Sequence, residues 1–324
     1  MKMTGKLLIA LAAPSALLAL SAAGADRASP RDAERGGAKD AAKARDAKPR
    51  REDFRPPDTV EMKVDLVYGK GGGQDLKLDL LLPKEQAKDS RPAILVIHGG
   101  GWVSGDKVDF RALASRFAEK GYVAASINYR LTPDGVFPSC VEDAKCSVRW
   151  MRANAKEYGV DPDRIAAYGF SAGGHLAAML GTVDKDASLE GNGGHEAFSS
   201  KVNAVVAVAA PTDIAALAQS AGKGARNGLL LVGARDLKTA DRKRMEQASP
   251  VFHVDAKDPP FLVCHGTADE TVPYAQAEAL WTKLKEARVP VEFQPVANGS
   301  HAQGKAQELA EAFLEVHMPA RRAR

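Results

Sequence analysis

The sequence has no strong excess of charge of either sign. Its 45 Lys and Arg residues stand against 41 Asp and Glu residues, so the net charge is only +4. Such a small excess gives no indication of a nucleic-acid partner. Features of a fibrous or repeat protein are also missing. With 324 residues, of which 45% are hydrophobic, the chain is long enough for one large domain or two small ones.

Cysteine is scarce, since the chain has only Cys140, Cys146 and Cys264. No pair of them has the spacing of metal ligands, so we predict no metal site from the cysteines. Cys140 and Cys146 both lie in an expected helix, where their separation is about 9 Å along the axis. A disulfide does not span that distance, so a bridge would require Cys140 to lie outside regular helix. Cys264 lies in an apolar strand and is predicted to be a buried thiol.

Long apolar runs are lacking as well. The run LLIALAAPSALLAL near the N-terminus is too short to span a bilayer comfortably, follows a short basic start and ends in small residues. This pattern is typical of a signal peptide. We therefore expect residues 1–25 to be removed before Asp26, the protein to be exported to the periplasm or the extracellular space, and no stable membrane insertion afterwards. An uncleaved anchor is the alternative, and Pro14 inside the run argues against it.

Residues 26–57 consist mainly of Ala, Arg, Lys, Asp, Gly and Pro, and Phe54 is their single aromatic residue. Such a segment cannot bury enough apolar surface to offset the entropy that is lost on ordering. We expect a disordered charged tether here. Its acidic residues are interleaved with the basic ones, which weakens the alternative of a basic arm that binds a surface.

Apolar runs indicate strands along the rest of the chain. Two alternating runs at 60–68 and 76–82, joined by a Gly-rich turn, predict a β-hairpin. Helical patterns lie between most of the later runs, which predicts an α/β fold with a mostly parallel sheet, helices on both faces and an antiparallel N-terminal edge. The later runs are of the buried-strand type and lie at 93–98, 122–129, 164–169, 202–210, 261–266 and 291–296.

We expect residues 58–318 to form this domain and residues 319–324 to be a basic tail. Two stretches, 183–200 and 215–250, have no clear assignment; the second contains GLLLVGA, which fits a strand or a helix. In open sheets of this kind, ligands bind outside the carboxyl ends of the strands. Functional residues are therefore expected directly after the apolar runs.

Ser171 is the candidate nucleophile. It lies at the centre of the G-x-S-x-G pattern of residues 169–173, between an apolar strand and an expected helix. A sharp strand-to-helix turn leaves room only for small residues two positions before and after the serine. The same turn exposes the hydroxyl near a helix N-terminus, where developing negative charge is favoured. A Gly-rich turn with an incidental serine is the alternative, and the strand–turn–helix context argues against it.

A serine hydroxyl is a weak nucleophile and needs a base. Of the seven histidines, His301 lies in the loop ANGSHAQG after the last apolar strand, where glycines at 299 and 304 let the loop reach across the sheet edge. We expect His301 to be the base. His175, on the helix that follows the serine, is expected to point away from it.

The base needs an acid that orients it. Asp269, in the segment TADETVP, lies directly after the strand at 261–266, where functional residues are expected. Asp236, in GARDLK, is the rival, but the segment before it is ambiguous and it is flanked by Arg235 and Lys238. Either residue could be a solvated surface carboxylate, and the position at a strand end favours Asp269.

The sequence HGGGW after the strand AILVIH supplies candidate donors for an oxyanion hole. Gly99, Gly100 and Gly101 let backbone N–H groups approach an oxyanion closely. We expect the amide of Ala172 to supply a further donor. The loop has neither the lysine of a P-loop nor the spacing of a dinucleotide-binding motif, which argues against phosphate binding. Trp102 is a candidate wall of the substrate pocket; packing under the loop is the alternative.

The segments HGGGW, GFSAG, HGTADETVP and GSH occur in this order, and over about residues 58–318 the chain resembles enzymes of the α/β-hydrolase fold. Within that fold it is similar to esterases with an HGGG motif. The segments DLKLDLLLP, SINYRLTP, FPSCVEDAKCSVRWMRANA and ASPVFHV are similar to the group that includes bifunctional acetylxylan and feruloyl esterases.

This resemblance implies a nucleophile, a base, an orienting acid and three oxyanion-hole amides. In that order they are Ser171, His301 and Asp269, with the amides of Gly100, Gly101 and Ala172. Relatives of the hormone-sensitive-lipase type carry a helical cap before the first strand, whereas here the charged tether occupies that place. The difference predicts an open site that suits bulky or polymeric esters.

Together these features predict a secreted serine carboxylesterase that forms an acyl-enzyme on Ser171 and needs no cofactor. Its expected partner is an ester substrate, and an acetylated or feruloylated carbohydrate polymer is the hypothesis for that substrate. The alternatives are a lipase, an arylformamidase or a peptidase of the same fold, or an inactive hydrolase-fold protein that serves as a binding module. The oligomeric state is left open.

Overall fold

The computed structural model describes residues 53–320 apart from residues 86, 184–186 and 302–303. The predicted signal peptide, the predicted tether up to residue 52 and residues 321–324 of the predicted basic tail lie outside the described residues. The described residues all belong to one unit of the chain, residues 50–324.

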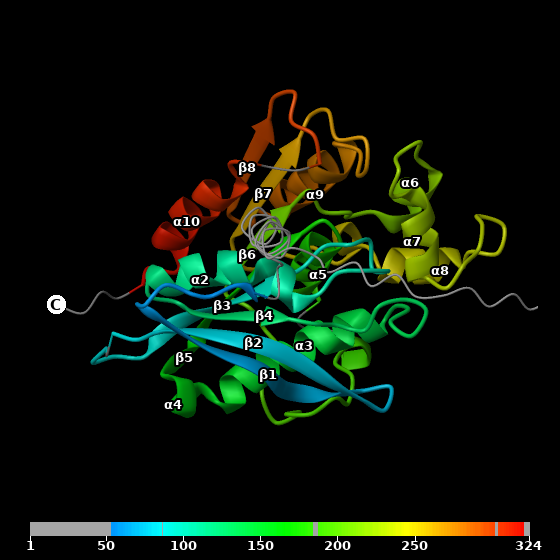
Figure 1. Ribbon diagram of the computed structural model, residues 1–324. Helices are drawn as coiled ribbons and strands as arrows, with labels where there is room; N and C mark the ends of the chain where they lie inside the picture. The colour runs from blue at the N-terminus through cyan, green and yellow to red at the C-terminus, as the bar shows by residue number, and fades with distance from the viewer. Residues whose placement is uncertain (1–52, 86, 184–186, 302–303, 321–324) are drawn as a thin grey trace, which may run out of the picture. The chain divides into compact units, whose positions relative to one another are not determined.

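Within the described part of the chain, eight strands form one sheet in the order β1-β2-β4-β3-β5-β6-β7-β8 (Figure 1). β2 pairs antiparallel with β1 and with β4, whereas all other neighbours are parallel. This confirms the predicted parallel sheet with an antiparallel N-terminal edge. The strands are β1 (Val60–Gly71), β2 (Gln74–Pro83), β3 (Arg91–Ile97), β4 (Val123–Ile127), β5 (Val160–Phe170), β6 (Ala204–Val208), β7 (Phe261–Gly266) and β8 (Val291–Val296).

Strand β3 shows how the sheet separates two apolar cores. Its residues Ala93, Leu95 and Ile97 belong to one cluster of buried side chains, whereas Ile94 and Val96 belong to the other. Successive side chains of a strand point to opposite faces, and every residue of β3 is buried. Both faces of the sheet are therefore covered, as expected for a central parallel strand.

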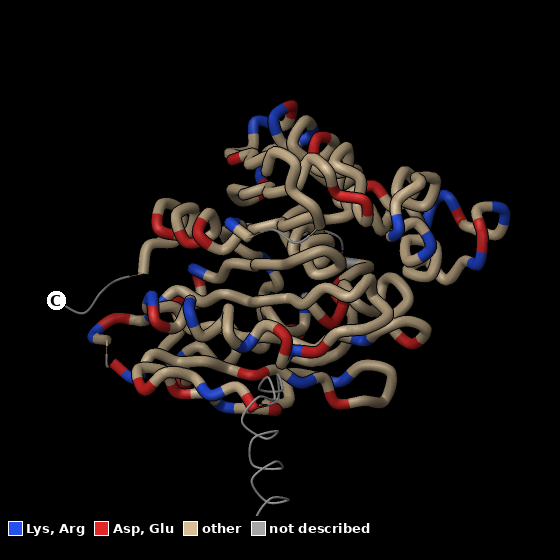
Figure 2. Tube along the Cα trace, turned by 45° about the horizontal axis from the view of Figure 1, so that its top comes forward, with Lys and Arg blue, Asp and Glu red and all other residues tan. Residues whose placement is uncertain are grey.

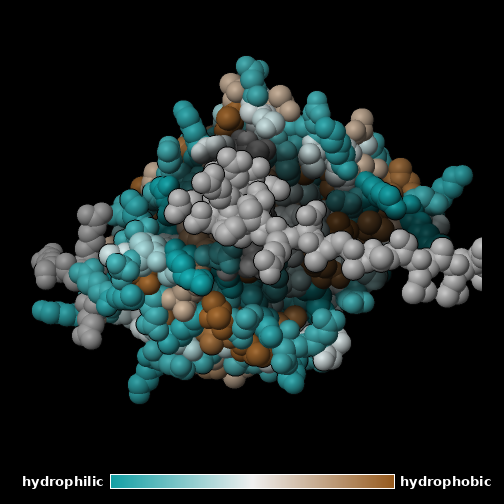
Figure 3. Space-filling view, in the orientation of Figure 1, coloured by the Kyte–Doolittle hydropathy of each residue, from teal (hydrophilic) through white to brown (hydrophobic). Residues whose placement is uncertain are grey.

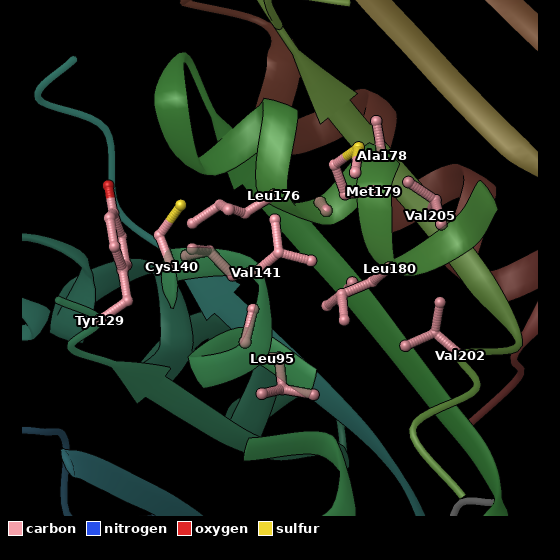
Figure 4. Packing of buried hydrophobic residues seen from close by; sticks show 14 of the residues in the cluster. Leu95, Tyr129, Cys140, Val141, Leu176, Ala178, Met179, Leu180, Val202 and Val205 are labelled. Carbon is pink, nitrogen blue, oxygen red and sulfur yellow. The ribbon is translucent and has the colours of Figure 1, made fainter. Parts of the chain in front are cut away.

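Among the described helices that cover the first face are α3 (Ser139–Ala153), α5 (Ala172–Thr182) and α9 (Ala275–Glu286). Figure 4 shows side chains of α3 and α5, among them Val141 and Leu176, gathered over the strands. Every residue of α5 is buried. A helix that is buried on all sides lies in the interior, and Ser171 directly precedes this buried helix.

In the part of the chain that the structure describes, α2 (Arg111–Glu119) and α10 (Ala306–His317) cover the second face. In α2 the buried residues Ala114, Phe117 and Ala118 recur at spacings of three and four, which is the pattern of one helix face. The helices predicted between the strands are thus present on both faces, which confirms the predicted fold class.

The two stretches without a sequence assignment differ in structure. Residues 187–200 contain the short helix η3 (Ala187–Leu189) and are held against α3 by Glu190, which accepts hydrogen bonds from Lys145 and Arg149 at 2.7 and 2.8 Å. The segment GLLLVGA begins in a helix, α7, rather than a strand. The remaining helices are α4 (Ala155–Tyr158), α6 (Ile214–Gln219), α7 (Ala225–Leu231), α8 (Arg242–Gln247), η2 (Lys107–Phe110) and η4 (Pro250–Phe252).

All three cysteines are buried free thiols. Cys140 and Cys146 both lie within α3, which is the geometry that the sequence analysis found incompatible with a bridge. Burial raises the pKa of Cys140 to about 12 and that of Cys146 to about 11. Burial likewise raises the pKa of Cys264 to about 11. These thiols are therefore protonated at neutral pH, whereas the reactive form of a cysteine is the thiolate.

The surface is mixed in charge. Figure 2 shows Lys and Arg interspersed with Asp and Glu along the described chain. In Figure 3, hydrophilic residues cover much of the visible described surface, and apolar residues form patches among them. Among the described residues, none of the helices combines the length and the apolar character needed to cross a membrane.

Candidate active site

The turn after β5 presents Ser171 between the last residue of β5 and the first residue of α5. Its φ of 56° and ψ of −121° lie outside the regions that L-residues ordinarily adopt. A Cβ on Gly169 would lie 1.9 Å from the carbonyl oxygen of Gly173, and a Cβ on Gly173 would lie 2.0 Å from that of Ile97. The backbones approach so closely that only glycine fits on either side of this strained serine.

The topology brings the turn beside the HGGG segment. β3 pairs with β4 on one side and with β5 on the other. The chain therefore adds β4 to one side of β3 and then crosses to the other side to form β5, so the strand order reverses between β3 and β5. Such a switch point opens a crevice at the carboxyl edge of the sheet. Ser171 after β5 and Gly99 to Gly101 after β3 therefore lie next to each other, and a Cβ on Gly99 would be 3.3 Å from the Cβ of Ser171.

Ser171, His301 and Asp269 form one chain of hydrogen bonds. Ser171 Oγ lies 2.9 Å from His301 Nε2, and His301 Nδ1 lies 2.7 Å from Asp269 Oδ2. Because an ionised carboxylate only accepts hydrogen bonds, Nδ1 carries the proton and Nε2 is free to accept one from the serine hydroxyl. The residues come from three separate loops, after β5, β7 and β8, which the sheet brings together.

Both carboxylate oxygens of Asp269 accept hydrogen bonds. Oδ1 accepts the N–H groups of Thr271 and Val272 at 2.8 and 3.0 Å, while Oδ2 accepts from His301. Burial alone would raise the pKa of this carboxyl, but hydrogen bonds from His265, His301 and the Val272 N–H outweigh it and hold the pKa well below the usual range. Asp269 is therefore ionised at neutral pH.

Asp236, the rival acid, forms hydrogen bonds within its own turn instead. Its carboxylate accepts the N–H groups of Lys238 and Thr239 at 3.0 and 2.9 Å and is exposed to solvent. The structure thus brings Asp269, and not Asp236, to His301.

The three predicted oxyanion-hole amides belong to the two segments that meet beside the serine, the loop after β3 and the start of α5. Ala172 is the first residue of α5, so its N–H has no partner within the helix. Within the described part of the chain, the amides of Gly100 and Gly101 donate to no backbone carbonyl. Gly100 has a φ of 107°, and a Cβ there would lie 2.0 Å from the carbonyl oxygen of Ser104, so only glycine fits this turn.

Trp102, predicted as a candidate wall of the substrate pocket, instead packs beneath the loop, where 1% of its surface is exposed. Its indole N–H donates to Nδ1 of His175 at 3.3 Å, and His175 Nε2 donates to the carbonyl oxygen of Ala248 at 2.7 Å. Burial lowers the pKa of His175 to about 4, so the ring is neutral at neutral pH. This neutral histidine joins the HGGG loop to α5 and to the segment after α8.

His98 and Tyr129 hold the loop at its start. Their rings stack with centroids 4.5 Å apart, and the Tyr129 hydroxyl donates to the carbonyl oxygen of His98 at 3.1 Å. His98 is buried, and that burial lowers its pKa. The loop that carries Gly100 and Gly101 is thus fixed by neutral, buried rings.

A cleft of about 620 Å³ borders this arrangement and is partly lined by Gly99, Gly100, Phe110 and Phe170. The rings of Phe170 and His301 lie 5.0 Å apart between centroids. Phe54 also lines the cleft and packs against the second core cluster. Because we expected Phe54 within a disordered tether, this packing is a correction: the ordered part of the chain begins before residue 58.

Four buried residues support the site without having been recognised from the sequence. Three of them adjoin a recognised motif, since His98 precedes the glycines of HGGG, His265 opens HGTADETVP and His175 follows GFSAG by two positions. Their positions at strand ends and beside motifs were the available signal. The fourth residue is Tyr129.

Residues 78–284, more than half of the chain, match the BD-FAE family. The chain belongs to this family. Among the curated relatives of this BD-FAE chain are the probable carboxylic ester hydrolase LipM and the esterase LipQ, both from Mycobacterium tuberculosis (strain ATCC 25618 / H37Rv). Each is 32% identical over 241 residues, which are 74% of this chain but 55% and 56% of the two relatives. The chain thus spans about half the length of these curated relatives.

Solved structures similar to this BD-FAE chain are esterases by their descriptions. A truncated carbohydrate esterase from gut microbiota has a TM-score of 0.68 at 28% identity, with 81% of this chain and 99% of that chain covered. Thermogutta terrifontis esterase 2, phosphonylated by sarin, has a TM-score of 0.70 at 31% identity, with 83% and 98% covered. These likenesses confirm the α/β-hydrolase fold and the predicted place of this domain among its esterases.

Proposed function

We propose that this protein is a serine carboxylesterase that forms an acyl-enzyme on Ser171. The hydrogen-bonded chain from Ser171 through His301 to Asp269 carries this proposal. It pairs a hydroxyl with a basic nitrogen whose tautomer is set by an ionised carboxylate. The esterase relatives support the same class of reaction.

In the proposed first step, Ser171 Oγ attacks the carbonyl carbon of the ester while His301 Nε2 takes the hydroxyl proton. The carbonyl oxygen becomes negatively charged and is held by the amides of Gly100, Gly101 and Ala172. His301 then gives its proton to the leaving alcohol, and the acyl group stays on Ser171. Water, deprotonated by the same histidine, releases the carboxylic acid in the second step.

We further propose that the natural substrate is an acylated carbohydrate. Support comes from the similar solved structures described as a carbohydrate esterase and as a bifunctional GH43-CE of Bacteroides eggerthii; the latter has a TM-score of 0.70 at 29% identity. Acetylated xylan should then be deacylated, with acetate release as the measurement. Turnover of small p-nitrophenyl esters without any acetate release from acetylated xylan would contradict this part of the proposal.

Export remains a proposal that rests on the sequence pattern of residues 1–25. Mass spectrometry of the protein recovered from its native host should find a mature N-terminus at Asp26. An intact N-terminus at Met1 would contradict processing at this site.

Replacement of Ser171 by alanine tests the proposed reaction. Ser171→Ala should lower kcat for p-nitrophenyl acetate by about 10⁶-fold, because the attacking atom is gone, while circular dichroism and Tm stay near those of the wild type. Ser199→Ala, at a surface serine, is the control and should keep full activity. Comparable turnover by a folded Ser171→Ala variant would end the proposal.

A further inference from the structure

His265 is a buried histidine that the proposed reaction does not use. It lies near the end of β7, with no exposed side-chain surface, and its ring meets that of Tyr274 edge-on at 6.1 Å between centroids. Its Nε2 lies 2.9 Å from the carbonyl oxygen of Val272 and 3.2 Å from Oδ2 of Asp269. Two acceptors thus meet one ring nitrogen.

These contacts fix the tautomer of His265. A carbonyl oxygen only accepts, so Nε2 carries a proton that is shared between Val272 and Asp269. The other nitrogen, Nδ1, is buried and has no hydrogen-bond partner among the described residues. A proton on Nδ1 would be a buried donor without an acceptor, which is costly, so the hydrogen-bond geometry places the donor at Nε2 and the lone pair at Nδ1.

The second acceptor links His265 to the proposed reaction. Asp269 Oδ2 receives His301 Nδ1 at 2.7 Å and His265 Nε2 at 3.2 Å, so both histidines approach the same oxygen. We propose, on the basis of the function proposed above, that His265 is a positioning residue for Asp269. Its N–H fixes the direction in which Oδ2 faces His301 and spreads part of the carboxylate charge over a second donor.

The effect on the pH profile has a defined sign. If the His265 donor is removed, the charge on Oδ2 is available to His301 alone, and the protonated form of His301 becomes more stable. Activity is then lost at a higher pH on the acid side of the profile. Among the described residues, the titratable side chains that contact His265 are Asp269 and, through its ring, Tyr274; its partner on β8 is the uncharged Pro295.

Two amide substitutions of His265 separate the effect of the donated hydrogen bond from the effect of the side chain's size. Glutamine places an N–H where Nε2 of histidine lies, whereas the shorter asparagine places its amide where Nδ1 lies. His265→Gln therefore keeps the donor to Asp269, and His265→Asn lacks it. His253→Asn is the matched control, because His253 bonds to the Gln247 carbonyl oxygen outside the hydrogen-bonded chain.

The experiment measures kcat and KM for p-nitrophenyl acetate from pH 5 to 9. The concentration of active sites, by which kcat is calculated, is titrated with a fluorophosphonate, and Tm is recorded for each variant. His265→Asn should lose about 10- to 100-fold in kcat, with KM little changed and the acid limb moved to higher pH. His265→Gln should retain kcat within about threefold of the wild type and an unmoved acid limb, as should His253→Asn. If His265→Asn does not fold, His265→Leu takes its place, with the same expectation.

Equal losses in His265→Gln and the donor-free variant, or a loss of kcat without any movement of the acid limb, would overturn the positioning role. A wild-type protein that neither turns over the ester nor reacts with the fluorophosphonate would instead refute the proposed function. The two failures are therefore distinguishable.

Discussion

On one side of Ser171 the loop after β3 rests on buried neutral rings, whereas on the other side the loops after β7 and β8 meet at one ionised carboxylate. On the first side, called the neutral side below, Trp102 and the neutral His175 form a hydrogen bond without any charge. On the second, called the charged side, His301 is hydrogen-bonded to the ionised carboxylate of Asp269. Packing thus fixes the loop of the proposed oxyanion amides, and a hydrogen bond to a charged group orients the proposed base. Perturbing the first region should change stability, and perturbing the second should change activity.

The largest effect is expected at the charged side. Asp269→Asn should lower kcat about 10⁴-fold, because the amide no longer holds His301 in the tautomer that accepts from Ser171. The remaining side-chain oxygen can still accept the N–H groups of Thr271 and Val272, so Tm should change little. Steady-state kinetics and thermal unfolding measure the two quantities.

Asp236→Asn is the matched control for that substitution. Its asparagine keeps an oxygen for the N–H groups of Lys238 and Thr239, and kcat should stay near the wild-type value. A larger loss of kcat in Asp236→Asn than in Asp269→Asn would show that Asp236, and not Asp269, is the acid that orients His301.

A smaller effect is expected on the neutral side, where the stability should depend on pH through His175. Burial lowers the pKa of His175 from 6.5 to about 4, so below pH 6.5 the unfolded chain binds a proton that the folded chain does not. The free energy of unfolding should therefore fall as pH falls through this window, by about 3 kcal/mol in all from this residue. Urea unfolding of the wild type and of His175→Gln measures it; an identical pH slope in both proteins would contradict the assignment.

Trp102→Phe should act on the same side with a somewhat smaller effect. It removes the indole donor and leaves Nδ1 of His175 without its partner, which should cost about 1–3 kcal/mol of unfolding free energy. Trp281→Phe, at a half-buried ring stacked on Phe293, is the control and should cost less. If Trp102→Phe lowered kcat strongly without any loss of stability, the two sides would not differ as described.

The smallest effect is expected in the cleft. Phe54→Ala should lower kcat/KM for esters with large apolar groups by about tenfold or less, relative to p-nitrophenyl acetate, because a wall of the cleft is removed. Phe252→Ala, at an exposed ring that does not line this cleft, serves as the control. Equal kcat/KM ratios in the two variants would remove Phe54 from substrate selection.

The charged side was the easier one to predict from the sequence. Asp269 and His301 each follow an apolar strand directly, and the rule that parallel strands end at one edge brings such residues together without knowledge of packing. The same rule located Ser171 and the glycines of HGGG. The strands themselves were predicted because buried runs of four to eight apolar residues are a local signal.

The neutral side depends on contacts between segments that are distant in the chain. Trp102 reaches His175, which is 73 residues away, and that histidine reaches Ala248, a further 73 residues on. No local pattern in the sequence encodes such pairings. Residues 215–250 were unassigned for a related reason, since GLLLVGA has an apolar character that suits a strand as well as the helix that it enters. Phe54 was assigned to the tether because composition alone does not reveal a cleft.

The most direct test of the account is to find where a fluorophosphonate binds covalently. The intact wild-type protein should gain the mass of one adduct, and peptide mapping should locate that adduct on Ser171. Ser171→Ala should remain unlabelled, and Asp269→Asn should label far more slowly than the wild type. An adduct on any other residue, or a folded wild-type protein that stays unlabelled, would contradict the assignment of Ser171 as the nucleophile.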